Sequence, residues 1–243
     1  MSSLFLSIVI PAYNEESRLP RTLGQVFAYL EKQPYSYEVI IVENGSTDRT
    51  LKIAQDFAAS HPALKALHEN RPGKGNAVRR GMLEAQGQYR FICDADLSMP
   101  IEEISKFLPP ELKDFDLAIA SREAPGAVRY HEPSYRHLGG RLINFVIQSL
   151  ILPGLNDTQC GFKCFRSEVA EKLFSQQTLT GWSFDIEVLY LARRRKCRLI
   201  EVPIDWYFDA ESKVNAVRDA FRMIGDIFRI YFNALRGRYD FHS

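Results

Sequence analysis

Short apolar runs rich in β-branched residues alternate with helical stretches along the first half of the chain, and this alternation strongly limits the possible folds. Five runs have the length and composition of buried strands: Leu4–Ile10, Tyr37–Glu43, Ala63–His68, Tyr89–Cys93 and Phe115–Ala120. The segments between them with helical spacing are Glu16–Gln33, Thr47–Ser60 and Lys74–Gln86. This order predicts an α/β domain with a mostly parallel sheet and right-handed crossovers.

The pattern changes after Arg122. A polar segment precedes an apolar helix expected around Leu138–Leu152, and a mixed region then extends to Asp209. The last segment, Val214–Leu235, is predicted to be one long helix. We therefore expect a main domain at residues 1–209 and a C-terminal amphipathic helix at residues 210–243.

The overall composition argues against several classes of protein. Of the 243 residues, 46% are hydrophobic and 25% are charged, as in ordinary globular proteins. A formal net charge of +1 gives no general attraction to nucleic acid, so no such partner is expected. The apolar runs are shorter than the roughly 20 residues of a membrane-spanning helix. The four cysteines have neither a disulfide nor a zinc pattern, which favours a cytoplasmic location.

Polar segments follow three of the predicted strands, at Pro11–Glu16, Glu43–Asp48 and Asp94–Ser98. In open parallel sheets, ligands bind outside the carboxyl ends of the strands. All three segments are rich in acids, amides and small residues. The sequence therefore predicts that the functional site lies at this edge of the sheet.

Asp94 and Asp96 are separated by one residue at the end of a strand. In an extended segment, residues two apart face the same side, so the two carboxylates repel each other unless a cation neutralises them. Mg²⁺ or Mn²⁺ bridged to phosphate oxygens meets that need. The alternative is a solvated acidic turn that caps the next helix.

The other two strand-end segments suggest a nucleotide site. Tyr13 and Glu15 could stack on and hydrogen-bond a base, although the neighbouring Asn14 is also a good helix cap. Glu43 poses the same choice. Gly73-Lys74-Gly75 precedes a helix, where glycines permit close backbone approach and a lysine suits a diphosphate.

Basic residues occupy loop-like positions in the second half of the chain, namely Arg122, Arg129, Arg136 and Lys213. Several converging cations could bind an anionic acceptor or the leaving diphosphate, whereas any single one is more often a solvated surface charge. Asp157 and Asp185 are candidate site residues that are also ordinary helix caps by pattern.

Together these segments resemble the family 2 glycosyltransferases, which have the GT-A fold. The resemblance runs from Ser7–Glu16 to Ser212–Val214 and is greatest to the dolichyl-phosphate glucosyltransferases and mannose synthases. Asp157–Lys163 and Trp182–Glu187 are the segments typical of this polyprenyl-phosphate group. The resemblance implies inverting transfer of a hexose, glucose before mannose, from a UDP- or GDP-sugar to a polyprenyl phosphate, with Mg²⁺ or Mn²⁺.

The resemblance also implies a role for each matching residue. Those expected to hold the donor nucleotide and sugar are Pro11, Tyr13, Glu15, Glu43, Lys74, Asp94, Ala95 and Gln159. Those expected to act on the reacting groups are Asp96, Asp185, Arg122, Arg136 and Lys213. The chain departs from the family pattern where Glu43-Asn44 replaces the usual pair of aspartates.

The predicted terminal helix is amphipathic. Its apolar stripe consists of Val214, Val217, Phe221, Ile224, Phe228, Tyr231 and Leu235, with Arg218, Arg222, Arg229 and Arg236 alongside. Such a helix can lie in a membrane interface or pack on protein. We expect a peripheral enzyme on the cytoplasmic face of a membrane. The other hypotheses are a transferase for a soluble saccharide, a nucleotidyltransferase and a non-catalytic nucleotide-sugar-binding module.

Overall fold

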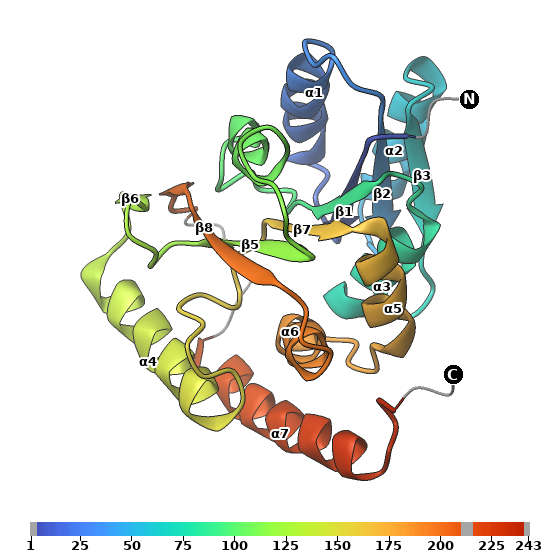
Figure 1. Cartoon of the computed structure of the whole chain (residues 1–243). Coiled ribbons are helices and arrows are strands. Elements are labelled where there is room, and N and C mark those ends of the chain that lie inside the picture. Colours follow the sequence, from blue (N-terminus) through green and yellow to red (C-terminus); the bar gives the residue numbers. More distant parts are fainter. Residues whose placement is uncertain (1–3, 210–215, 241–243) are drawn as a thin grey trace.

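The computed structural model describes residues 4–209 and 216–240 and contains one large sheet flanked by helices (Figure 1). The first half of the chain forms β1 (Leu6–Ala12), α1 (Leu19–Leu30), β2 (Tyr37–Glu43), α2 (Thr50–Ser60), β3 (Leu64–His68), α3 (Lys74–Glu84) and β4 (Tyr89–Ile92). The second half forms a 3-10 helix, η1 (Ile101–Phe107), then β5 (Leu117–Ser121), β6 (Val128–Tyr130), α4 (Ser134–Leu150), β7 (Lys163–Arg166), α5 (Ser167–Gln176), α6 (Phe184–Arg194), β8 (Leu199–Pro203), β9 (Asp205–Tyr207) and α7 (Ala216–Leu235).

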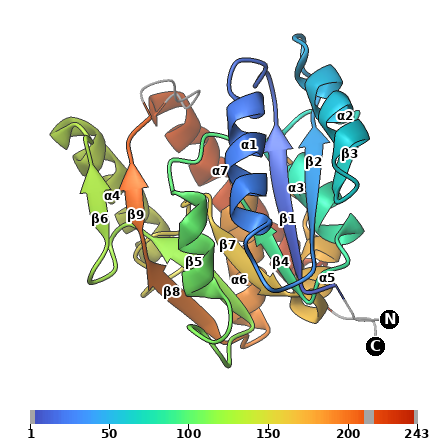
Figure 2. The same ribbon diagram turned by 90° about the horizontal axis from the view of Figure 1, so that it is seen from above.

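The large sheet has the strand order β3-β2-β1-β4-β7-β5-β8. All neighbouring pairs are parallel except those of β7, which runs antiparallel to both β4 and β5. The predicted mostly parallel α/β fold is therefore confirmed. A second, two-stranded parallel sheet pairs β6 with β9 beyond the β8 side of the large sheet (Figure 2).

Helices cover both faces of the sheet because its central strands are apolar on both sides. In β1, Ile8 packs with the α1 residues on one face, whereas Val9 packs with α3 and α6 on the other. All seven residues of β1 are buried except the half-buried Pro11. A sheet buried on both faces leaves the ends of its strands as the place where a ligand can bind.

Two helices begin later than the sequence pattern indicates. The α1 helix begins at Leu19 rather than Glu16, because the preceding loop is bonded to the loop after β2: the Glu16 N–H donates to Asp48 Oδ2 at 3.1 Å. The α2 helix begins at Thr50 rather than Thr47, where Asp48 Oδ1 accepts the Thr50 N–H at 2.9 Å. Residues expected in two first helical turns therefore form the loops at the strand ends.

The predicted terminal helix is present as α7, and one of its faces packs on the domain. Met223, Ile227 and Ile230 are buried in the core that also contains α6 residues. The opposite face leaves Phe228 and Leu235 66% and 86% exposed. No helix within residues 4–209 and 216–240 is long and apolar enough to cross a bilayer.

Helix α3 approaches the sheet closely at Gly81. A Cβ atom there would lie 2.3 Å from Val9 Cγ1 and 3.0 Å from Val42 Cγ2. In α1, by contrast, a Cβ atom on Gly24 would meet nothing within 4 Å. The two helical glycines therefore differ in the space around them.

We predict that Gly81→Ala lowers the free energy of unfolding by about 1–3 kcal/mol, because the added methyl group overpacks the sheet. Gly24→Ala is the matched control and should raise it by up to about 1 kcal/mol through helix propensity. Urea unfolding followed by circular dichroism measures both. Equal shifts in the two variants would contradict the close packing of α3.

Candidate active site

The loop after β1 is fastened to the loop after β2. Asn14 has a φ of +52°, and its N–H donates to Ser46 Oγ at 3.0 Å while its Oδ1 accepts the Thr47 N–H at 2.8 Å. Asparagine tolerates this left-handed conformation better than most residues. The turn displays Tyr13, which is 50% exposed, at the carboxyl edge of the sheet.

Glu15 and Glu43 occupy different environments at this edge. Glu15 forms an ion pair with Arg18 at 3.5 Å, and Arg18 contacts Asp209 at 3.1 Å. Glu43 is only 1% exposed. Its carboxylate accepts the Ser46 N–H through Oε1 and contacts His68 Nδ1 at 2.5 Å through Oε2. Glu43 is therefore held beneath the surface by two protein partners.

Asn44, which replaces a family aspartate, fixes the segment before Lys74. Its side-chain amide donates to the Arg71 carbonyl at 2.6 Å, and its Oδ1 accepts the Gly73 N–H at 2.8 Å. Gly73 has a φ of +120°, and a Cβ atom there would lie 2.2 Å from the Thr180 carbonyl oxygen. The glycine is therefore required by close packing against the second half of the chain.

Lys74 begins α3 and points to the aspartate pair. Its Nζ lies 2.6 Å from Asp94 Oδ1 and 4.8 Å from the ring centroid of Trp182, which is 44% exposed. Burial opposes the charge of Lys74, but Asp94 and Asp185 outweigh burial and raise the pKa of Lys74. Lys74 is therefore a mostly buried cation that contacts a carboxylate and an indole ring.

Asp94 and Asp96 lie in a turn after β4, not in an extended strand as the sequence pattern suggested. Leu97 follows with a φ of +47°, and the Ser98 N–H donates to Asp96 Oδ1 at 2.9 Å. Burial, and then the charge of Asp94, raise the pKa of Asp96. Ala95 is itself buried, and its carbonyl accepts the Thr22 hydroxyl at 2.6 Å.

The aspartate pair fits a divalent cation. Burial and, after it, the charge of Asp94 raise the pKa of Asp96 although Lys74 lies 2.6 Å from Asp94, and a cation bound between the two carboxylates would oppose both effects. Within the described residues, no group of three or more histidine, cysteine, aspartate or glutamate side chains could hold a metal ion by itself. Two carboxylates suit Mg²⁺ or Mn²⁺ when phosphate oxygens and water complete the coordination.

A second buried ion pair lies next to the first. Lys163 Nζ is 2.8 Å from Asp185 Oδ1 and donates to the Cys160 carbonyl at 2.5 Å, and the Lys163 side chain is 2% exposed. Burial raises the pKa of Asp185, against the opposing charges of Lys163 and Lys74. The turn before β7 also packs closely against Asp94, because a Cβ atom on Gly161 would lie 2.2 Å from Asp94 Oδ2.

Arg122 is held by a bidentate salt bridge to Asp157. Its Nε and Nη2 lie 2.6 Å and 2.9 Å from the two carboxylate oxygens, and its guanidinium lies 5.4 Å from the Trp206 ring centroid. The fully buried Asp157 also accepts the Gln159 N–H at 3.3 Å. Burial opposes the Asp157 charge, but Arg122 outweighs burial and lowers the pKa of Asp157.

The structure describes the remaining predicted cations to different extents. Arg129 is not a solvated surface charge, because its side chain is 15% exposed and pairs with Glu123 at 2.5 Å and Glu132 at 2.6 Å. Arg136 falls in the first turn of α4, and its side chain is not described. Lys213 lies outside the described residues. Their roles at the site therefore stay predictions.

Two residues beside the aspartates were not singled out from the sequence. Lys163 and Trp182 both occur in segments that carry the family resemblance, but neither was assigned a role. A lysine within the apolar run Gly161–Phe165 is a usable signal, because a lysine in a buried strand requires a carboxylate partner. Trp182 gave no comparable signal in sequence.

The comparisons with known proteins agree with this geometry. The model of the family "Glycosyl transferase family 2" matches residues 7–174. The chain is 36% identical to a dolichyl-phosphate beta-glucosyltransferase of Drosophila melanogaster, over 99% of this chain and 78% of that protein. It is 33% identical to the human protein of the same description, over 96% and 76%. The chain therefore belongs to glycosyltransferase family 2, as the sequence motifs predicted.

Solved structures show the same fold at lower sequence identity. Glucosyl-3-phosphoglycerate synthase of Mycobacterium tuberculosis in complex with UDP is 18% identical, with a TM-score of 0.67 over 93% of this chain and 80% of that chain. A complex of the same enzyme with Mn²⁺ and UDP-glucose gives a TM-score of 0.62 over 99% and 80%. The expected GT-A fold is thereby confirmed.

The Arg122–Asp157 pair leads to a prediction about pH. Because the pKa of Asp157 is lowered by folding, its contribution to stability is present above the unfolded value of about 4 and is lost as the pH falls below it. Asp157→Asn should lower the free energy of unfolding at pH 7 by about 3–5 kcal/mol. The difference from the wild type should shrink as the pH falls from about 4.

The control is Asp56→Asn, which breaks the solvent-exposed pair with Lys52. It should cost less than about 1 kcal/mol at any pH. Denaturant unfolding between pH 3 and pH 7 measures both variants. A pH-independent deficit in Asp157→Asn would show that the carboxylate charge is unimportant for the Arg122 contact.

Proposed function

We propose that this chain is an inverting hexosyltransferase that moves glucose from UDP-glucose to a polyprenyl phosphate such as dolichyl phosphate. The curated relatives named above are dolichyl-phosphate beta-glucosyltransferases and align over nearly the whole chain. This supports glucose over mannose as the transferred sugar and a polyprenyl phosphate over a soluble saccharide as the acceptor.

The observation that carries the proposal is the pair of adjacent ion pairs, Lys74–Asp94 and Lys163–Asp185. They bring the donor segments of the first half and the acceptor segments of the second half to one point. Both aspartates contribute to the charge balance of Lys74. Transfer of a sugar from a diphosphate to a phosphate needs a site that provides positive charge to both anionic groups.

The residues of the first half would hold the donor. Tyr13, Pro11 and Glu15 would border the base, and Asp94 and Asp96 would hold Mg²⁺ or Mn²⁺ at the diphosphate. The divalent ion, when bound, neutralises the negative charge on the leaving diphosphate. Lys74 would exchange its contact with Asp94 for a phosphate oxygen, which leaves both carboxylates free to bind the ion.

The acceptor needs little chemical activation. A phosphate monoester is already an anion near neutral pH, so it can attack the anomeric carbon without a strong general base. Asp185 is held by Lys163 at 2.8 Å, which suits an orienting role better than proton abstraction. Gln159 would border the sugar, and Arg122, with Arg136 and Lys213, would provide positive charge near the phosphates.

The lipid acceptor also calls for contact with a membrane surface. Helices α4 and α7 lie next to each other, and the Tyr231 hydroxyl donates to the Leu150 carbonyl. Their outward apolar side chains are Leu142, Phe145, Leu150, Ile224, Phe228, Phe232 and Leu235. Arg222, Arg229 and Arg236 are exposed beside them. We propose that residues 1–209 perform transfer while α7, with α4, docks peripherally on the cytoplasmic face of a membrane.

We predict that the chain consumes UDP-glucose in preference to GDP-mannose, UDP-GlcNAc and UDP-galactose, and only when polyprenyl phosphate and Mg²⁺ or Mn²⁺ are present. Asp96→Asn should reduce this transfer by at least about a hundredfold, because it removes a proposed ligand of the metal ion that would neutralise the leaving diphosphate. Its melting temperature should not fall, since burial and Asp94 disfavour the Asp96 charge. Release of UDP and formation of glycolipid are measured together.

Asp56→Asn, on the exposed face of α2, serves as the activity control. If glucose were transferred to a soluble saccharide and not to polyprenyl phosphate, the proposed lipid acceptor would be wrong. Near-normal transfer by Asp96→Asn would overturn the metal assignment.

We predict that the chain floats with liposomes containing anionic lipid. The double variant Phe228→Glu, Phe232→Glu should lose most of this flotation, because two charges would have to enter the apolar boundary. The control, Gln55→Glu with Ala59→Glu, places the same added charge on the exposed face of α2. Equal flotation of both double variants would exclude α7 as the membrane contact.

A further inference from the structure

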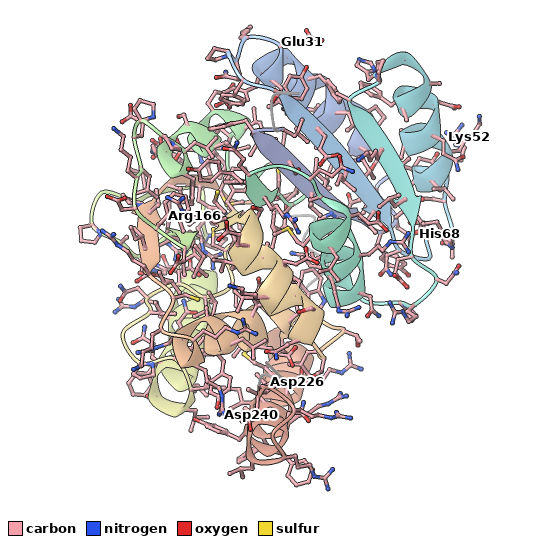
Figure 3. The ribbon with its side chains drawn as sticks, turned by 45° about the vertical axis from the view of Figure 1, so that its right-hand side comes forward. Glu31, Lys52, His68, Arg166, Asp226 and Asp240 are labelled. Carbon is pink, nitrogen blue, oxygen red and sulfur yellow. The ribbon has the colours of Figure 1, made fainter. Side chains whose placement is uncertain are left out.

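One buried carboxylate at the carboxyl edge of the sheet supports an exposed histidine. Ala12, Glu43 and His68 form one row, because each is the last residue of β1, β2 or β3 and they pair in register. Glu43 Oε2 lies 2.5 Å from His68 Nδ1. Figure 3 shows His68 at the end of β3, where the chain turns toward α3.

The histidine is connected to the Tyr13 loop by a chain of hydrogen bonds. The Asn14 N–H donates to Ser46 Oγ at 3.0 Å, and the Ser46 N–H donates to Glu43 Oε1. The other Glu43 oxygen contacts His68. These hydrogen bonds connect His68 to the backbone of Asn14, the residue that follows the exposed Tyr13 in the loop after β1.

The two members of the pair differ in accessibility. The Glu43 side chain is 2% exposed and its two oxygens already have protein partners, whereas the His68 side chain is 43% exposed. A ligand at this edge can therefore reach His68 but not the carboxylate. Because Nδ1 faces Glu43, Nε2 is the ring nitrogen left for a ligand.

The charges around His68 favour its protonated form. The hydrogen bond to Glu43 raises the pKa of His68, and the negative charge of Glu69 and a hydrogen bond to Asn70 act in the same direction. Glu69 is itself paired with Arg71 at 3.0 Å. An imidazolium has two N–H donors and no acceptor, so Nε2–H can only donate, either to Asn70 or to a ligand that takes its place.

We propose that His68 is a specificity-determining residue that donates a hydrogen bond from Nε2 to a carbonyl oxygen of the donor nucleobase, with Glu43 as its positioning residue. The inference rests on the proposed function in one respect, namely that this edge binds a nucleoside diphosphate. A uracil presents a carbonyl oxygen at C4, whereas a cytosine presents an amino group there. A fixed donor therefore favours uracil and rejects cytosine.

The proposal fixes a direction for pH dependence. Nε2 donates in the imidazolium, and deprotonation lets the ring lose that donor while Nδ1–H is kept by Glu43. Affinity for UDP should therefore be highest below the pKa of His68 and should fall as the pH rises through it. Glu43→Gln removes the anionic partner, so the fall should move to lower pH.

The test measures UDP and CDP binding by titration calorimetry, with Mg²⁺, between about pH 6 and 8.5. Wild type should bind UDP about tenfold or more tightly than CDP at pH 6. His68→Phe keeps an aromatic ring without a donor and should lose this ratio through weaker UDP binding. NMR titration of the His68 ring in wild type and Glu43→Gln should show a lower pKa in the variant.

His61→Phe is the matched control, because His61 precedes β3 at its opposite end and stacks on Phe57. It should leave the UDP to CDP ratio unchanged. If wild type binds no nucleotide, the proposed function fails. If wild type binds UDP but His68→Phe keeps the same UDP to CDP ratio, the role of His68 fails while the proposed function stands. An unchanged His68 pKa in Glu43→Gln would overturn the positioning role of Glu43.

Discussion

Charge neutralisation in a partly buried space is the constraint on which the rest of this structure depends. The charge of Asp94 acts on both Asp96 and Asp185, and among the described residues Lys74 and Lys163 are the cations that directly offset these carboxylates. Leaving any of these groups buried without a partner would cost several kcal/mol. The surrounding loops therefore have to place both lysines accurately, and the same placement suits the anionic donor and the anionic acceptor that we propose.

Glycines make this arrangement possible by letting the two halves of the chain approach closely. Gly73 and Gly75 pack against the backbone at Leu179 and Thr180, and Gly161 packs against Asp94. Side chains at these positions would separate the segments that we propose bind the donor from those that we propose bind the acceptor. Geometry at the reacting centre is thus set by backbone contacts rather than by flexible side chains, which suits a reaction that relies on positioning.

Much of the first half could be predicted from sequence because its strands are continuous apolar runs and its loops are rich in acids and amides. The second half was less predictable. Lys163 interrupts the apolar pattern of β7, and its partner Asp185 is 22 positions away in a helix, so no local pattern joins them. The burial of Glu43 was also invisible, because the pattern marks a strand end without showing that His68, on the neighbouring strand, covers it. Pairings between distant segments decide such contacts.

The position of β7 between two strands that precede it in the chain has a consequence for how the molecule is assembled. This strand fills the space between β4 and β5, and both of those precede it in the chain. During synthesis, β4 and β5 would remain unpaired edges facing each other until residues 163–166 emerge and join them. The same insertion brings Gly161 against Asp94. A chain that ends before β7 therefore lacks both the link between β4 and β5 and the contact of Gly161 with Asp94, and residues 161–166 supply the two together.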